Sequence, residues 1–207
     1  ENDLLLLNIV NSANIACGYH AGDKATMEKT IEISKKNKVS IGAHPSFNDK
    51  ENFGRKKLNL QPAEITTLII DQINILSEIA KKKDMIVTHV KPHGALNNMA
   101  CEDHELAKII TKSIIQANKD LIFLVPTGSQ MEKAGKKIGL RIAAEIFADR
   151  NYEDDGNLIS RSKKNAMILD PEISKNHVIK MIENQSLNCY SGKQIPCKID
   201  SICVHGD

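Results

Sequence analysis

The sequence has almost no net charge and no long apolar run. Its 28 Lys and Arg residues against 26 Asp and Glu residues leave a formal charge of +2 over 207 residues. This balance lacks the basic stripe that nucleic-acid-binding proteins carry, so we expect no nucleic-acid partner. No stretch approaches the ~20 apolar residues that a membrane-spanning helix requires. The opening Leu4–Leu7 run is too short for a signal peptide and follows no basic segment. We therefore expect no membrane partner.

Paired cysteines and three common functional motifs are also absent. The five cysteines are odd in number and never spaced as C-x-x-C, which argues against a disulfide framework or a zinc knuckle. Reduced thiols predict a cytoplasmic protein. The chain contains no G-x-x-x-x-G-K-[ST], no G-x-G-x-x-G and no H-E-x-x-H. A nucleotide would therefore have to be held by another device or by another subunit.

Short β-branched or apolar runs alternate with amphipathic segments along the chain. This alternation is typical of an α/β fold with a parallel sheet. We expect strands at 8–16, 39–43, 85–90, 121–125, 140–147 and 201–204. We expect helices at 24–37, 62–83, 103–118, 129–138 and 171–184, and a hairpin or excursion over 188–198.

No internal repeat, low-complexity tract or linker divides the sequence, so we expect one domain over residues 1–207. The chain opens at Glu1 rather than Met and stops at Asp207 directly after an apolar run. We expect both ends to be incomplete.

Small, polar and ionisable residues follow the C-terminal end of nearly every predicted strand. In parallel α/β folds, ligands bind at these ends because the loops that follow the strands meet there. The histidines in or beside these clusters are His20, His44, His89, His93 and His205. The other two, His104 and His177, lie near predicted helix starts and are expected at the surface. Such a concentration of imidazoles at one rim indicates an enzyme.

The clusters after the first two strands supply the first candidates. His20 is a candidate acid, base or metal ligand, and Asp23 is either its partner or the N-cap of the next helix. We favour the cap. Cys17 is interpreted as a buried packing residue rather than a nucleophile. His44 is a second catalytic candidate. Arg55, in the loop beyond it, is either a carboxylate or phosphate ligand or a solvated loop residue.

The third and fifth strands supply the central candidates. His89, Lys91 and His93 alternate, so they would share one face of an extended strand. Burying Lys91 requires an anionic partner, either a charged substrate group or a carboxylate such as Glu145. A purely structural salt bridge is the alternative. Glu145 is a candidate general acid or base with a pKa raised by burial.

The last two strands end in further binding candidates. Asp149 and Arg150 are predicted to form an ion pair that shapes their loop. Arg161 is a weaker anion-binding candidate. His205 and Asp207 repeat the pattern of a histidine followed by Gly-Asp that occurs after the first strand.

Five stretches together carry a family resemblance. They are SANIACGYHAGD (12–23), IGAHPSFND with FGRK (41–49, 53–56), HVKPHGALNN (89–98), EIFADRNYEDDGNLISR (145–161) and ICVHGD (202–207). In this order, and spread over nearly the whole chain, they resemble the LamB/YcsF family. The resemblance implies a distorted seven-stranded (β/α) barrel of the glycoside hydrolase/deacetylase type. The family's opening strand and its final helix are absent from this sequence, so the six predicted strands agree with that fold.

The resemblance also implies an activity, which is ATP-dependent opening of 5-oxo-L-proline (pyroglutamate) to L-glutamate, in complex with 5-oxoprolinase subunits B and C. A five-membered lactam is a stable amide, so its hydrolysis is coupled to ATP, accompanied by Mg²⁺, through phosphorylation of the lactam oxygen. The cationic candidates for phosphate and carboxylate are Lys91, Arg55 and Arg150. The candidates for a base that delivers water are His20, His44, His93 and Glu145.

Two other classes of function stay open. Three histidines and carboxylates at one rim can hold Zn²⁺ in a metal-dependent amide or carbohydrate deacetylase or hydrolase. A non-catalytic subunit that presents substrate to its partners is the third class. We rank the oxoprolinase subunit first and the metallohydrolase second, and whether a metal is bound stays open.

Overall fold

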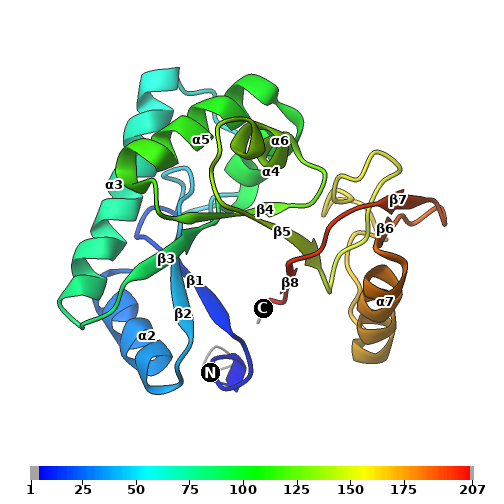
Figure 1. Cartoon of the computed structure of the whole chain (residues 1–207), viewed down its shortest axis with the longest axis horizontal. Helices are drawn as coiled ribbons and strands as arrows, with labels where there is room; N and C mark the ends of the chain where they lie inside the picture. Colours follow the sequence, from blue (N-terminus) through cyan, green and yellow to red (C-terminus); the bar gives the residue numbers. More distant parts are fainter. Residues whose placement is uncertain (1–4, 206–207) are drawn as a thin grey trace.

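The core of the protein is a curled parallel sheet with the strand order β1-β2-β3-β4-β5-β8. The computed structural model describes residues 5–205. The sheet strands are β1 (Ser12–Ala16), β2 (Ser40–His44), β3 (Val87–Val90), β4 (Ile122–Pro126), β5 (Ile142–Phe147) and β8 (Ser201–Cys203). Every neighbouring pair is parallel. The predicted α/β class and its six strands are confirmed, and the sheet curls into a half-barrel with β1 and β8 at its edges (Figure 1).

Helices cover the outer face of the half-barrel. They are α2 (Lys24–Lys36), α3 (Pro62–Lys81), α4 (Gly94–Glu102), α5 (His104–Asn118) and α6 (Gln130–Lys137), and a further helix is α7 (Pro171–Asn184). Figure 1 shows α2 to α6 along the sheet, whereas α7 lies beyond β8 with the antiparallel hairpin β6 (Ser186–Asn188) and β7 (Gln194–Pro196). The hairpin and five helices confirm predictions to within a few residues. Helix α4 was not predicted, because its polar HGALNN start is typical of a loop.

Helix α3 shows how the sequence produces this layer. Gln61 and Glu64 form a capping box around Pro62 at the first helical position. The apolar stripe of α3 is buried, with Ile69 and Leu76 fully inaccessible to solvent. Burying each such side chain contributes roughly 1.5–3 kcal/mol. This stripe packs on the sheet and on α5, so it fixes the outer layer against the strands.

The first predicted strand is shorter than its sequence pattern. Strand β1 begins at Ser12 rather than at residue 8, because the amide groups of Asn8 and Ile9 donate to the carbonyls of Leu5 and Leu6 in a turn. Among residues 5–205, no helix is long and apolar enough to cross a membrane.

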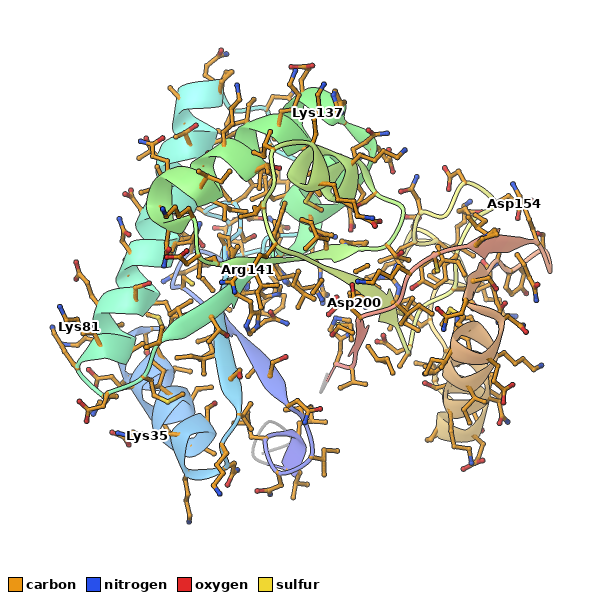
Figure 2. The ribbon with its side chains drawn as sticks, viewed as in Figure 1. Lys35, Lys81, Lys137, Arg141, Asp154 and Asp200 are labelled. Atoms are coloured by element: carbon orange, nitrogen blue, oxygen red, sulfur yellow. The ribbon has the colours of Figure 1, made fainter. Side chains whose placement is uncertain are left out.

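Lysines cluster at the helix ends. Lys35, Lys81 and Lys137 lie in the last turns of α2, α3 and α6, where positive charge complements the helix dipole, and they point outward (Figure 2).

The two faces of each strand have different roles. Outward residues such as Ile41, Val90 and Phe123 join the apolar core under the helices. The strand register aligns Asn14, Gly42 and His89 in one row across β1, β2 and β3. His89 alternates with Val90 and therefore faces the inside of the curl. Gly42 leaves the space that the His89 imidazole fills, because a Cβ atom there would overlap the ring.

Replacing Gly42 by Ala is expected to destabilise the protein by about 1–3 kcal/mol, because the added methyl group overpacks against His89. The measurement is the unfolding free energy in urea. In a His89→Ala background the same substitution should cost much less, since the ring is gone. An equal cost in both backgrounds would show that the contact with His89 is not the cause.

Candidate functional site

The candidate site is a cavity of about 470 Å³ at the carboxyl ends of the strands. Its wall includes the loop after β2, the start of α4, the loop before α6 and the segment after β5. The predicted site residues that line it are His44, Arg55, Lys91, His93, Arg150 and His205. Those that do not line it are His20, Asp23, Glu145 and Asp149. Asp207 lies outside the described residues.

Three histidines from different loops form one cluster. The ring of His20 stacks on that of His93, with centroids 4.1 Å apart, and His44 meets His93 edge to face at 4.8 Å. Nε2 of His44 is 3.1 Å from Nδ1 of His93. The outer nitrogens contact backbone oxygens: Nδ1 of His44 is 2.6 Å from the Lys91 carbonyl and Nε2 of His93 is 2.9 Å from the Phe53 carbonyl. The predicted gathering of imidazoles is confirmed for these three rings and for His205, which lines the cavity, whereas His89 lies within strand β3 and does not line it.

The surroundings of the cluster favour uncharged imidazole rings. Burial, followed by the neighbouring His93, lowers the pKa of His20 to about 3. Burial also lowers the pKa of His44 well below its ordinary value and that of His93 to about 4, with Lys91 adding repulsion in both cases. At neutral pH the three rings are therefore uncharged, and each keeps a lone pair on one ring nitrogen.

A tight loop places the Phe53 carbonyl against His93. Phe53 and Gly54 both have positive φ, of 55° and 67°. A side chain at Gly54 would overlap Ser46 and crowd His20, so glycine is required here for space as well as for conformation. The amide of Ala95 donates to the Gly54 carbonyl at 2.9 Å, which anchors this loop on the start of α4.

Lys91 and Glu145 form a buried ion pair beneath the cavity. Their side chains are only 5% and 2% exposed. The ammonium also donates to Sγ of Cys203 at 3.2 Å and lies 4.7 Å from the centroid of the Phe147 ring. Burial alone would lower the pKa of Lys91, but attraction to Cys203 and Glu145 outweighs it and raises that pKa. Lys91 is therefore a permanent cation in the cavity wall, and Glu145 is its counterion.

The segment after β5 is arranged differently from the prediction. Oδ2 of Asp149 accepts from Nδ1 of His205 at 2.9 Å. The guanidinium of Arg150, 5% exposed, donates to the carbonyls of Ile159 and Ala166. The predicted Asp149–Arg150 ion pair is therefore wrong among the described residues, because His205 from the end of β8 reaches the carboxylate. Through these two hydrogen bonds Arg150 instead joins separate parts of the loop that follows β5, and it also lines the cavity.

Four other expectations are decided by the local contacts and exposure of single residues. Asp23 is the exposed N-cap of α2 and accepts from the Thr26 amide at 2.8 Å, which confirms the favoured interpretation. Cys17 packs in the core, and burial raises its pKa to about 12, so it is an inert thiol. His177 is not a surface residue: it lies within α7, half-buried, with its ring stacked near Tyr152 at 6.3 Å. His104 is exposed, as predicted.

The structure adds residues that sequence reasoning missed. Phe53 contributes a carbonyl to His93 and lies beneath the Arg55 guanidinium at 5.1 Å. Lys57 also lines the cavity. The basic run from Arg55 to Lys57 was a usable signal for that lysine. No side-chain pattern indicates the Phe53 carbonyl, because its contribution comes from the backbone.

The histidine cluster does not present a ready metal site. Residues 5–205 contain no group of three or more His, Cys, Asp or Glu side chains placed to hold an ion. The hydrogen bonds of His44 and His93 direct their ring nitrogens to each other and to backbone carbonyls rather than to a common point. The described residues therefore do not supply the ligand set that a zinc hydrolase would use.

A curled parallel sheet with helices outside and ionisable side chains gathered at its strand ends defines an α/β half-barrel protein of the enzyme type. The chain belongs to the LamB/YcsF family, which it matches over residues 1–207. It is 46% identical over 202 residues to the A subunit of 5-oxoprolinase from Clostridium beijerinckii, an alignment that covers 98% of this chain and 79% of the relative. It is 44% identical to the corresponding A subunit from Brevibacillus brevis, over 100% of this chain and 81% of the relative.

A solved structure has the same fold. The crystal structure of the lactam utilization protein from Thermus thermophilus superimposes with a TM-score of 0.91 and 33% sequence identity, covering 98% of this chain and 82% of that one. The family expectation drawn from the five sequence stretches is confirmed.

Replacing Glu145 by Gln is expected to destabilise the fold by roughly 3–5 kcal/mol, because the buried Lys91 charge loses its carboxylate. Urea unfolding measures the change. Adding Lys91→Met should recover much of the loss. The exposed pair Lys108–Glu105 is the control, since Lys108→Met there should cost less than about 1 kcal/mol. A Glu145→Gln variant as stable as wild type would contradict the assigned role.

Replacing Asp149 by Asn is expected to lower the pKa of His205. The hydrogen bond that His205 donates to Asp149 and the contact with Cys203 raise that pKa from 6.5 to about 10. A raised pKa in the folded state stabilises the fold below pH 6.5, and this stabilisation is lost as the pH rises through about 10. Histidine NMR titration should show His205 moving toward its ordinary value in the variant. The stability gap to wild type should close above pH 10, and an unshifted titration would refute the pairing.

Proposed function

We propose that this chain is a subunit of an ATP-dependent 5-oxoprolinase, which hydrolyses 5-oxo-L-proline to L-glutamate in the cytoplasm together with subunits B and C. The observation that carries the proposal is a cation-lined cavity in a chain 46% identical to a protein named as the A subunit of 5-oxoprolinase. The superimposed Thermus protein is named a lactam utilization protein, which supports the same class of substrate.

The cavity suits a small anionic substrate and its phosphorylated form. Its basic lining residues are Arg55, Lys57, Lys91, Arg150 and Arg161, together with His205, whose raised pKa keeps it protonated at neutral pH. Glu102 and Asp155 are the acidic residues among the described lining. This excess of positive charge favours the carboxylate of 5-oxoproline and a phosphoryl group on its lactam oxygen.

The proposed chemistry follows from the stability of the lactam amide. ATP, accompanied by Mg²⁺, would transfer its γ-phosphoryl group to the lactam oxygen and leave as ADP. Water would then add to the ring carbon, and the C–N bond would break so that the nitrogen leaves as the amine of glutamate. A second water would hydrolyse the resulting acyl phosphate to the carboxylate and phosphate. Lys91 would stabilise charge on the transferred group, and Arg55 and Arg150 would bind substrate oxygens. An imidazole of the cluster that is uncharged at that stage would take the proton from the attacking water. Glu145 supports this arrangement as a positioning residue, because it is the counterion of Lys91 and does not line the cavity.

We also propose that the half-barrel is completed as a seven-stranded barrel. In the described residues, β1 and β8 each have a sheet neighbour on one side only. Oδ1 of Asn14, on the edge strand β1, is buried without a hydrogen-bond partner. A further strand between β1 and β8 would satisfy such groups and close the sheet.

The decisive experiment is an assay of glutamate release from 5-oxo-L-proline by the full-length protein reconstituted with subunits B and C, with and without ATP. Glutamate that requires both ATP and this chain would support the proposal. Its absence from an assembled complex would overturn it. ATP-independent hydrolysis together with a stoichiometric bound metal would favour the metallohydrolase instead.

Replacing Arg55 by Gln is expected to lower kcat/KM for 5-oxo-L-proline at least about tenfold, because a charge-assisted bond to a substrate oxygen is lost. Steady-state kinetics of the reconstituted complex is the measurement. Lys112→Gln, on an exposed position of α5 that does not line the cavity, removes the same charge and should leave kcat/KM unchanged. Equal effects of both substitutions would show a general charge effect and remove Arg55 from the site.

A further inference from the structure

His44 and His93 lie in a chain of three contacts that ends in a carbonyl oxygen on each side. The chain runs from the Lys91 carbonyl to Nδ1 of His44 (2.6 Å), from Nε2 of His44 to Nδ1 of His93 (3.1 Å), and from Nε2 of His93 to the Phe53 carbonyl (2.9 Å). A carbonyl oxygen can only accept a hydrogen bond. Each imidazole must therefore place a proton on its outer nitrogen.

This arrangement is one proton short. A neutral imidazole carries a single ring proton, so two neutral rings use both protons on the outer bonds. Nε2 of His44 and Nδ1 of His93 then face each other with two lone pairs at 3.1 Å. One added proton would complete an N–H···N bond between the rings and satisfy all three contacts. The geometry thus forms a proton-binding position between two rings that both line the cavity.

Positive neighbours and burial keep this position empty in the ligand-free protein. His20 stacks on His93 and has its own Nδ1 buried without a partner, and it too is neutral. The charged groups that repel a proton on the pair are Lys91, Arg55 and His205. Burial together with these charges lowers the pKa of His93 to about 4. All three cations line the same cavity as the pair.

An anion in the cavity would favour protonation of the His44–His93 pair. Its charge would offset that of the three cations, while the unmade bond between the rings would continue to favour the proton. We infer that the His44–His93 pair takes up one proton when an anion enters the cavity, so that binding creates a shared imidazolium beside the ligand. The inference rests on the proposed function in one respect, which is that the cavity binds anions.

The test is isothermal titration calorimetry of the full chain with sulfate, which stays doubly charged between pH 6 and 8. The dependence of the heat on the ionisation enthalpy of the buffer counts the protons taken up. We expect close to one proton per sulfate at pH 7, and an affinity that rises as the pH falls, by at most about tenfold per pH unit.

The matched variants are His93→Gln and His104→Gln. The amide introduced at position 93 has two N–H donors, so it can donate to Nε2 of His44 and to the Phe53 carbonyl without an added proton. His93→Gln should therefore bind sulfate with no proton uptake. His104 is exposed at the start of α5 and does not line the cavity, so His104→Gln should behave like wild type.

A second measurement does not depend on a variant. NMR of the wild-type chain with ¹⁵N-labelled histidine should show one ring proton on each of His44 and His93 without sulfate, and a third proton between them with sulfate. The inference is overturned if sulfate does not bind, if it binds without proton uptake, or if folded His93→Gln still takes up the proton. None of these readouts requires glutamate formation, so failure of the proposed function would be seen separately.

Discussion

The buried ammonium of Lys91 connects the parts of this site. Its ion pair with Glu145 links the end of β3 to β5 across β4, and its bond to Cys203 brings in β8. Its backbone carbonyl receives His44 from β2. Removing two charges from water is costly, and the cost is offset only while both partners keep this geometry. The strand ends are therefore held together by a charge that also faces the cavity.

The charge of Lys91 also contributes to the low pKa values of His44 and His93. Lys91, Arg55 and His205 make the cavity electropositive, and together with burial they keep the imidazole cluster uncharged. A site built in this way attracts an anion first and leaves its bases free to accept protons. Electrostatics thus connects substrate attraction with acid–base chemistry, although the contributing side chains come from distant segments of the chain.

The sequence patterns predicted the strands and most helices, but not which side chains pair with each other at the strand ends. Strand–helix alternation identified all six sheet strands, and parallel topology explains why histidines from distant segments meet. Helix α4 was missed because its first turn carries residues typical of loops, and tertiary contacts with Gly54 stabilise it there. The pairing of Asp149 with His205 rather than with its neighbour Arg150 depends on how β8 lies beside β5, which local spacing cannot reveal.

The sequence by itself determined the class of fold, the strand ends at which chemistry is concentrated and the family, because periodicity and motif content are properties of neighbouring residues. Only the tertiary structure decided that Glu145 neutralises Lys91, that the Phe53 carbonyl engages His93, and that His177 lies half-buried near Tyr152. These are contacts between segments, and one of them uses the backbone, which is the same in every residue. Their geometry depends on how the sheet curls, and a sheet curls according to the packing of the whole chain.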